Sequence, residues 1–243
     1  HNGRRRQRQM CIRDSYKGCG TCVHCSTGWQ QLCVDGVKEV FGVTGHGAHA
    51  KYMKCPANTL VKLREDISFK SGAAISCGTG TAWGAIDRLC LRSHETLAVF
   101  GLGPVGLSAV MIASSMGVNV IALDTNQKRL NRAKSFGAGN ILNPLKSDNV
   151  IDAIKDLTKG LGAHASIDAS SSPEARSQSI KCLRTWGKAC FVGEGGDVKI
   201  DVSNDLLRRQ ITLIGSWTFS KHGQYACAAV SYTHLRAHET IAD

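Results

Sequence analysis

The segment from Val99 to Asp124 constrains the fold of this chain more than any other stretch. It opens inside an apolar segment, Leu97–Phe100, which predicts a buried strand. GLGPVG follows, then an apolar helix to about Met116, and then a second apolar strand, Val118–Leu123, which ends at Asp124. A strand, a glycine-rich turn, a helix, a strand and an acid in this order indicate a dinucleotide-binding unit.

Each glycine of the turn has a physical role in such a unit. Gly101 permits the tight turn, Gly103 lets the backbone approach a pyrophosphate, and Gly106 lets the helix pack closely on the strand. The helix N-terminus offers free N–H groups and a partial positive charge to the phosphates. Glycines also occur in plain turns, so GLGPVG indicates dinucleotide binding only because predicted strands flank it. The expected pyrophosphate site comprises Gly101, Gly103, Pro104, Val105 and Gly106.

Asp124 is the expected partner of the coenzyme ribose. It lies 18 residues after Gly106, where a carboxylate can accept hydrogen bonds from both ribose hydroxyls. Its negative charge would repel a 2′-phosphate on that ribose. The sequence therefore predicts NAD rather than NADP as the cofactor.

The strand and helix pattern continues along the chain and predicts an α/β fold. Alternating strands and helices indicate parallel crossovers and a doubly wound Rossmann sheet with strand order 3-2-1-4-5-6. The expected helices after the first are Asn126–Phe136, Val150–Leu157 and Pro173–Leu183. The expected strands are Leu97–Phe100, Val118–Leu123, Asn140–Asn143, Ala165–Ala169, Lys188–Gly193 and Gln210–Gly215.

Four of the 11 cysteines are spaced as metal ligands. Cys19, Cys22, Cys25 and Cys33 follow the pattern C-x2-C-x2-C-x7-C, and four thiolates on one short loop predict a tetrahedral, structural zinc site. Disulfides are a poorer interpretation, because the chain shows no secretory signal and the spacing is close. An iron–sulfur cluster is a further alternative, although ferredoxin-type sequences space the last cysteine differently.

With this loop ahead of the coenzyme unit, the chain resembles the zinc-containing alcohol dehydrogenases of the medium-chain dehydrogenase/reductase family. The resemblance implies a GroES-like, mainly β catalytic domain that carries the structural zinc loop. It also implies that Cys77 in CGTGT is the last protein ligand of a catalytic zinc and that Thr81 packs against the nicotinamide. Residues 68–89 predict a helical stretch of small residues that CGTGT interrupts. A small buried cysteine in this turn is the alternative for Cys77.

The resemblance adds three residues to the expected coenzyme site. Val192 and Gly193 fall where the family lines the nicotinamide face, and Arg129 matches a basic residue that reaches the adenosine ribose. A solvated helix charge is the alternative for Arg129. Asp168, at the end of a predicted buried strand, is expected to be structural.

The implied function is a zinc-dependent oxidoreductase that transfers hydride between an alcohol (primary, secondary or polyol) and NAD. A catalytic zinc needs three protein ligands and an open position, whereas this sequence supplies only Cys77. We therefore expect the catalytic zinc site to be incomplete and the 243-residue chain not to oxidise alcohols. The expected partner is a small-molecule alcohol, and neither nucleic acid nor a membrane is expected to bind. The chain is interpreted as a fragment of a longer dehydrogenase, and that parent enzyme is expected to be a homodimer or homotetramer.

The two ends of the chain resemble translated sequencing-library adapter. Residues 10–14, MCIRD, can be encoded by the reverse complement of a sequence that encodes residues 230–234, VSYTH. Without residues 1–15 and 229–243, the net charge falls from +11 to +8, which suits an anionic cofactor. The expected organisation is 1–15 tail, 16–78 partial catalytic domain, 79–217 NAD-binding domain, 218–228 return to the catalytic domain, and 229–243 tail.

Two other functions remain open at this point. One is a zinc-independent, NADPH-dependent reductase of the same superfamily, which Asp124 and the cysteine loop both disfavour. The other is a noncatalytic nucleic-acid-binding protein with a zinc loop and a basic arm. The cysteine content without a secretory signal predicts a reducing, cytoplasmic location.

Overall fold

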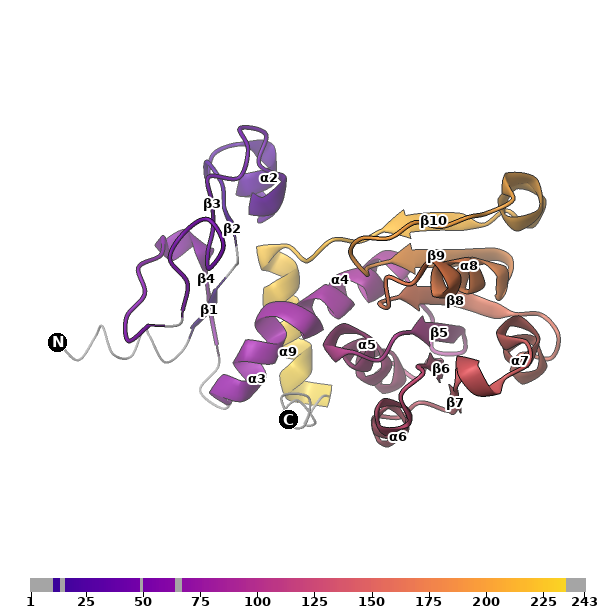
Figure 1. Cartoon of the computed structure of the whole chain (residues 1–243). Coiled ribbons are helices and arrows are strands. Elements are labelled where there is room, and N and C mark those ends of the chain that lie inside the picture. Colours follow the sequence, from indigo (N-terminus) through magenta and orange to yellow (C-terminus); the bar gives the residue numbers. More distant parts are fainter. Residues whose placement is uncertain (1–10, 14–15, 49, 64–66, 235–243) are drawn as a thin grey trace. The chain divides into compact units, whose positions relative to one another are not determined.

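The computed structural model describes residues 11–13, 16–48, 50–63 and 67–234. The chain divides into two compact units: the first contains the residues up to Gly80 and those from Phe219 onward, and the second runs from Thr81 to Thr218. The second unit contains a six-stranded sheet, and Figure 1 shows helices packed beside it.

The sheet of the second unit is parallel throughout, in the spatial order β7-β6-β5-β8-β9-β10. Numbered within the sheet, this order is 3-2-1-4-5-6, so the predicted doubly wound α/β fold is confirmed. The strands are β5 Thr96–Phe100, β6 Asn119–Leu123, β7 Asn140–Leu142, β8 Ala163–Asp168, β9 Leu183–Phe191 and β10 Thr212–Gly215.

Crossovers between parallel strands are right-handed as a rule, so the reversal of the strand order after β7 places helices on both faces of this sheet. Helix α5 packs against α6, and α7 against α8. The helices are α4 Gly80–Leu89, α5 Pro104–Ser115, α6 Gln127–Ser135, α7 Val150–Leu157 and α8 Pro173–Lys181. Shorter helical turns are η4 Pro144–Lys146, η5 Val202–Leu206 and η6 Leu207–Arg209.

Burial on both faces explains why the central strands are apolar at nearly every position. In β5 the four residues from Leu97 to Phe100 are all at most 1% exposed. Alternate residues of β5 and β6 point to the face where α7 and α8 pack. There they form one core with residues of those helices, of β8 and of β9. Its members are Ala98, Phe100, Ile121, Leu123, Val150, Ile154, Ala163, Ile180, Cys182, Leu183 and Ala189.

The first unit contains short strands and the cysteine loop. Strands β2 and β3 form one antiparallel pair, and β1 and β4 another. The strands are β1 Cys11–Arg13, β2 Tyr16–Lys17, β3 Glu39–Val40 and β4 Leu60–Lys62. The helices and turns are α2 Val23–Ser26, η1 Gln30–Leu32, η2 Ala57–Thr59, α3 Phe69–Ala74, η3 Ile75–Thr79 and α9 Lys221–His234.

The structure differs from the sequence-based expectation at the CGTGT motif. CGTGT does not break its helix: the wider π-turn η3 joins α3 directly to α4. Residues 11–13 and 229–234, expected to be tail, form β1 and the end of α9. Backbone pairing with a free strand edge and helix continuation need no particular side chains. These elements therefore carry no information on where the tail residues come from.

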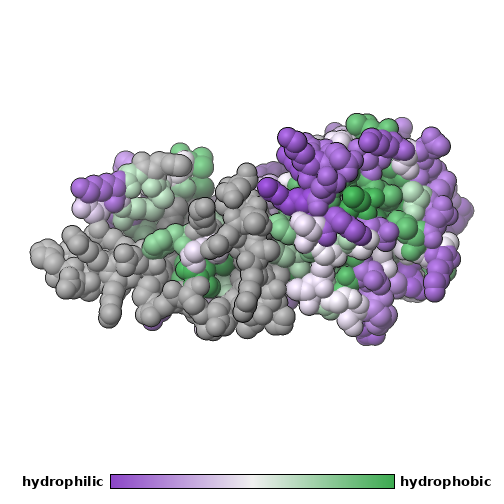
Figure 2. Space-filling model, turned by 90° about the horizontal axis from the view of Figure 1, so that it is seen from below, coloured by the Kyte–Doolittle hydropathy of each residue, from purple (hydrophilic) through white to green (hydrophobic). Residues whose placement is uncertain are grey.

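No helix in the described part of the chain combines the length and apolar character required to cross a membrane. On the face of the second unit visible in Figure 2, hydrophilic residues surround smaller apolar areas. This pattern is ordinary for the surface of a folded domain.

Candidate functional site

The loops that follow β5 and β8 meet at the carboxyl edge of the sheet. These strands are neighbours at the point where the strand order reverses, which is where ligands bind in open α/β sheets. Gly101 has φ +86°, and a Cβ atom there would lie 2.8 Å from the backbone of Ser170. Only glycine satisfies both conditions, so Gly101 allows the two loops to approach each other.

The two other glycines of GLGPVG have opposite surroundings. A Cβ atom on Gly106 would overlap the carbonyl oxygen of Gly101, so the missing side chain lets α5 pack closely on β5. A Cβ atom on Gly103 would meet no atom within 4 Å. Gly103 is the N-cap of α5 and provides no side-chain cap. The helix therefore begins at an open surface, where its first N–H groups face a space that suits a phosphate.

Asp124 lies beside this loop and is only 8% exposed. Its Oδ2 accepts a hydrogen bond from the Leu102 N–H at 2.7 Å, and its Oδ1 accepts one from the Asn126 N–H at 2.8 Å. Arg129, half exposed, places Nη1 3.6 Å from Oδ2. A carboxylate has about four acceptor positions, so Asp124 retains capacity for ribose hydroxyls while it holds the glycine loop to β6.

A buried ion pair organises the loops after β8 and β9. Arg176 of α8 donates from Nε to Oδ2 of Asp168 at 3.0 Å, and Asp168 is fully buried. The other guanidinium nitrogens donate to the carbonyl oxygens of Gly193 and Gly196. Because Asp168 also accepts from the N–H and hydroxyl of Ser170, one ion pair connects both loops.

The predicted nicotinamide residues lie in the loop that this ion pair holds. The N–H groups of Val192 and Gly193 both donate to the Asp168 carbonyl oxygen at 2.9 Å. A Cβ atom on Gly193 would lie 2.7 Å from the Ser171 backbone nitrogen. The structural role expected for Asp168 agrees with these contacts. Arg176 was not predicted from the sequence, where its position four residues into a helix after a buried acid was the only available signal.

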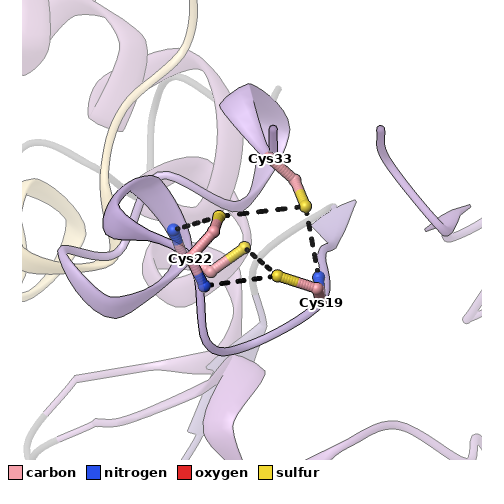
Figure 3. A group of neighbouring side chains, drawn as sticks. Cys19, Cys22 and Cys33 are labelled. Carbon is pink, nitrogen blue, oxygen red and sulfur yellow. Dashed lines mark hydrogen bonds between the residues drawn. The ribbon is translucent and has the colours of Figure 1, made fainter. Parts of the chain in front are cut away.

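In the first unit, the four cysteines converge on one point. Their sulfur atoms all lie within 4.8 Å of one another, and Figure 3 shows those of Cys19, Cys22 and Cys33 turned toward each other. The Cys19–Cys25 and Cys22–Cys33 sulfur separations are both 4.0 Å. A tetrahedral zinc with Zn–S bonds of about 2.3 Å places its sulfurs about 3.8 Å apart. The donor set therefore fits zinc.

Backbone N–H groups prepare the sulfurs for negative charge. The N–H groups of Cys19, Cys22 and Cys25 donate to the sulfurs of Cys33, Cys19 and Cys22 respectively, at 3.3 to 3.5 Å. Hydrogen bonds from the backbone N–H groups of Cys25 and Val34 are the two largest causes that lower the pKa of Cys22 to about 6, and backbone hydrogen bonds also lower the pKa of Cys19. Burial raises the pKa of Cys25 to about 12. A bound cation would offset that cost, because metal coordination deprotonates thiols.

Residues far along the chain hold the cysteine loop in place within the first unit. Gln31, buried between Cys25 and Cys33, donates from Nε2 to the Phe219 carbonyl oxygen at 2.9 Å. The Lys221 N–H donates to the Gly28 carbonyl oxygen at 2.8 Å. The loop is therefore a fixed part of the first unit.

Cys77 and Thr81 lie on the continuous helix from α3 to α4. Cys77 sits in the π-turn η3 and is exposed. It is therefore not the buried cysteine of the alternative interpretation. Single π-turns inside helices are frequent at functional sites. Thr81 lies in the first turn of α4 and is partly buried.

Comparisons with known proteins agree with this fold. A protein-family profile described as "Zinc-binding dehydrogenase" matches residues 104–232. An uncharacterized zinc-type alcohol dehydrogenase-like protein, YphC, of Escherichia coli strain K12 is 34% identical over 212 residues, which are 87% of this chain and 60% of that protein. An alcohol dehydrogenase of Geobacillus stearothermophilus is 33% identical over 73% of this chain and 51% of that enzyme.

Among solved structures, the alcohol dehydrogenase of Aeropyrum pernix superposes with a TM-score of 0.83 at 23% identity. The match covers 92% of this chain and 65% of that chain, and at this identity it supports the fold alone. The present chain thus spans between half and about three fifths of the two curated relatives.

Proposed function

The chain belongs to the zinc-binding dehydrogenase family, and on that premise we propose that it forms the NAD-binding part of an alcohol-oxidising dehydrogenase. The observation that carries the proposal is the open N-terminus of α5 beside the buried carboxylate of Asp124. Together they offer an anion site and a ribose acceptor at the reversal point of the sheet.

Each part of a bound NAD would have a partner in this chain. The α5 N–H groups at Gly103 would hold the pyrophosphate, and Asp124 with Arg129 would bind the adenosine ribose. The loop at Val192 and Gly193 would line the nicotinamide. When bound, NAD supplies the hydride acceptor of the reaction. The protein orients the coenzyme, and Asp124 excludes a phosphate at the ribose 2′ position.

We further propose a structural zinc in the four-cysteine loop and a role for Cys77 as one ligand of a catalytic zinc. A zinc with an open position lowers the pKa of a bound hydroxyl group. Thr81 would orient the nicotinamide ring. Cys77 is the one catalytic ligand that the resemblance places in these 243 residues, so we expect coenzyme binding without alcohol oxidation.

Titration of the chain with coenzymes tests this proposal. We expect NADH to bind with an affinity at least about tenfold higher than that of NADPH, which corresponds to about 1.4 kcal/mol of repulsion between Asp124 and the 2′-phosphate. The measurement is the change in NADH and NADPH fluorescence on binding.

Asp124→Asn is the matched variant for this titration, because an amide of the same shape removes the charge and keeps one acceptor oxygen. That oxygen can serve the Leu102 N–H, and the NH2 group then faces the Asn126 N–H. We expect the difference in affinity between NADH and NADPH to be smaller for this variant than for the unmodified chain. Equal affinity of the unmodified chain for both coenzymes would contradict the assigned role of Asp124. A preference for NADPH would favour the zinc-independent reductase instead.

Metal analysis tests the cysteine loop separately. We expect the chain to retain one zinc ion per molecule, and Cys25→Ser to lose it because three sulfurs and a hydroxyl bind zinc more weakly. Cys90→Ser is the control, since Cys90 is exposed and lies outside the four-sulfur group. Cobalt substitution should give thiolate charge-transfer absorption in the unmodified chain and in the control. A chain that contains no metal after expression in zinc-supplemented medium would refute the assignment.

A further inference from the structure

A cavity lies at the amino edge of the Rossmann sheet, at the opposite end of the strands from the glycine loop. Its volume is about 320 Å³, and it lies entirely within the second unit. The start of β8 contributes His164, and the start of β9 contributes Arg184, Trp186 and Lys188. His94 and Glu95, just before β5, also line it.

A break in the β8–β9 register brings the β9 side chains to this cavity. Ala163 pairs with Leu183, but Ala165 pairs with Lys188. Residues 184–187 therefore bulge out opposite His164, and such bulges redirect side chains. Trp186 has φ +66° and is 72% exposed. A left-handed conformation costs a non-glycine residue roughly 1–2 kcal/mol, and backbone strain of this kind is concentrated at functional positions.

The hydrogen bonds of His164 are unbalanced. The Thr96 N–H donates to Nδ1 at 3.0 Å, and Arg184 places Nη1 2.8 Å from Nε2. Backbone and guanidinium N–H groups can only donate. A neutral imidazole accepts at one nitrogen and an imidazolium at neither, so one of these contacts sets a donor against a donor. Since Thr96 is fixed in β5, the Arg184 side chain is the group that can turn.

Positively charged side chains also outnumber carboxylates around His164. Burial and the positive charge of Arg184 lower the pKa of His164. Because the Thr96 N–H donates to Nδ1, a neutral ring carries its proton on Nε2. Glu95 is the one carboxylate lining the cavity, and it accepts from the Arg92 N–H. Among the described residues, no carboxylate lies within 4.0 Å of the Arg184 or Lys188 nitrogens. Lys188 donates to the Leu89 carbonyl oxygen at the end of α4.

We propose that this cavity binds a phosphate group, either as the free ion or as a small phosphate monoester. One phosphate oxygen accepts from the Nε2–H of His164 and from the Arg184 guanidinium, which removes the conflict between donors. Lys188 adds positive charge, and the Trp186 ring forms an apolar wall that would contact the organic part of an ester. Because the cavity faces away from the coenzyme edge, this site is independent of the proposed NAD site.

Calorimetric titration of the whole chain with inorganic phosphate tests the site. We expect saturable binding in the millimolar range and a loss of affinity of about tenfold in Arg184→Gln, as for a charge-assisted hydrogen bond. His164→Asn should lose affinity similarly: asparagine can still accept from the Thr96 N–H but cannot reach the ligand. Arg208→Gln is the control, because Arg208 is an exposed arginine that contacts Asn204 instead. Phosphate bound at the start of α5 would be unaffected by these variants.

A titration with phenyl phosphate distinguishes the two sources of phosphate. The ligand would be identified as a monoester if the chain bound phenyl phosphate more tightly than inorganic phosphate and if Trp186→Ala lost this difference in affinity. Equal affinity of the unmodified chain for phenyl phosphate and inorganic phosphate would identify the ligand as the free ion. No binding, or equal binding by the unmodified chain, Arg184→Gln and His164→Asn, would overturn the proposal.

Discussion

Alanine at Gly106 is expected to lower the free energy of unfolding by about 3 kcal/mol or more. The added methyl group would overlap the carbonyl oxygen of Gly101. Both groups belong to the backbone framework of the loop and α5, so no side-chain rotation relieves the overlap. For a chain of this size the loss corresponds to a fall in Tm of roughly 6–12 °C. Thermal and urea unfolding followed by circular dichroism measure it.

Gly103→Ala is the matched control, three residues away in the same loop. Because no atom lies within 4 Å of the added methyl group, we expect a stability loss below about 1 kcal/mol. The methyl group would nevertheless occupy the space proposed for the pyrophosphate, so NADH affinity should fall by about tenfold or more. An unfolding curve of Gly106→Ala that matches the unmodified chain would contradict the packing role. Unchanged NADH binding by Gly103→Ala would contradict the pyrophosphate site.

Replacement of Arg176 by methionine is expected to cost about 3–5 kcal/mol, because it leaves a fully buried carboxylate without its ion-pair partner. The carbonyl oxygens of Gly193 and Gly196 also lose their donors. The unfolding free energy from urea titration is the measurement. Asp168→Asn in the same chain should restore much of the loss, since it removes the unpaired charge but keeps an acceptor for Ser170.

Lys17→Met is the control for this prediction. Lys17 pairs with Glu39 at 3.5 Å, but the two side chains are 44% and 28% exposed. Exposed pairs of this kind contribute at most about 1 kcal/mol. If Arg176→Met destabilised the chain no more than Lys17→Met, the ion pair would not hold the two loops together.

The Rossmann sheet could be predicted from the sequence because its strands are short apolar runs between recognisable helices. The GLGPVG turn and the glycines at the helix ends mark the boundaries, so most predicted strands agree with the structure within two residues. β9 is the exception, because it begins at Leu183 instead of Lys188. Its first half is an irregular bulge rich in polar residues, and no periodicity reveals such a segment.

The residues of the candidate site could be predicted only where they lie close together in the sequence as well as in the fold. The four cysteines lie within 15 residues, so their spacing predicts a cluster, and the structure brings their sulfurs together. Arg176 acts instead through the fold: it reaches Asp168 on one side and two carbonyl groups 17 and 20 residues away on the other. The π-turn at Cys77 was missed because glycine and threonine there suggest a break in the helix, whereas tertiary packing maintains it.

The chain crosses between its two units twice, and this has a consequence for synthesis on the ribosome. The second unit is continuous in sequence, from Thr81 to Thr218, and can fold as soon as it has emerged. The cysteine loop emerges earlier, but the backbone groups that anchor it belong to Phe219 and Lys221. The first unit to be translated is therefore the last to be completed, because its cysteine loop gains these two anchors only after residues 219–221 have been made.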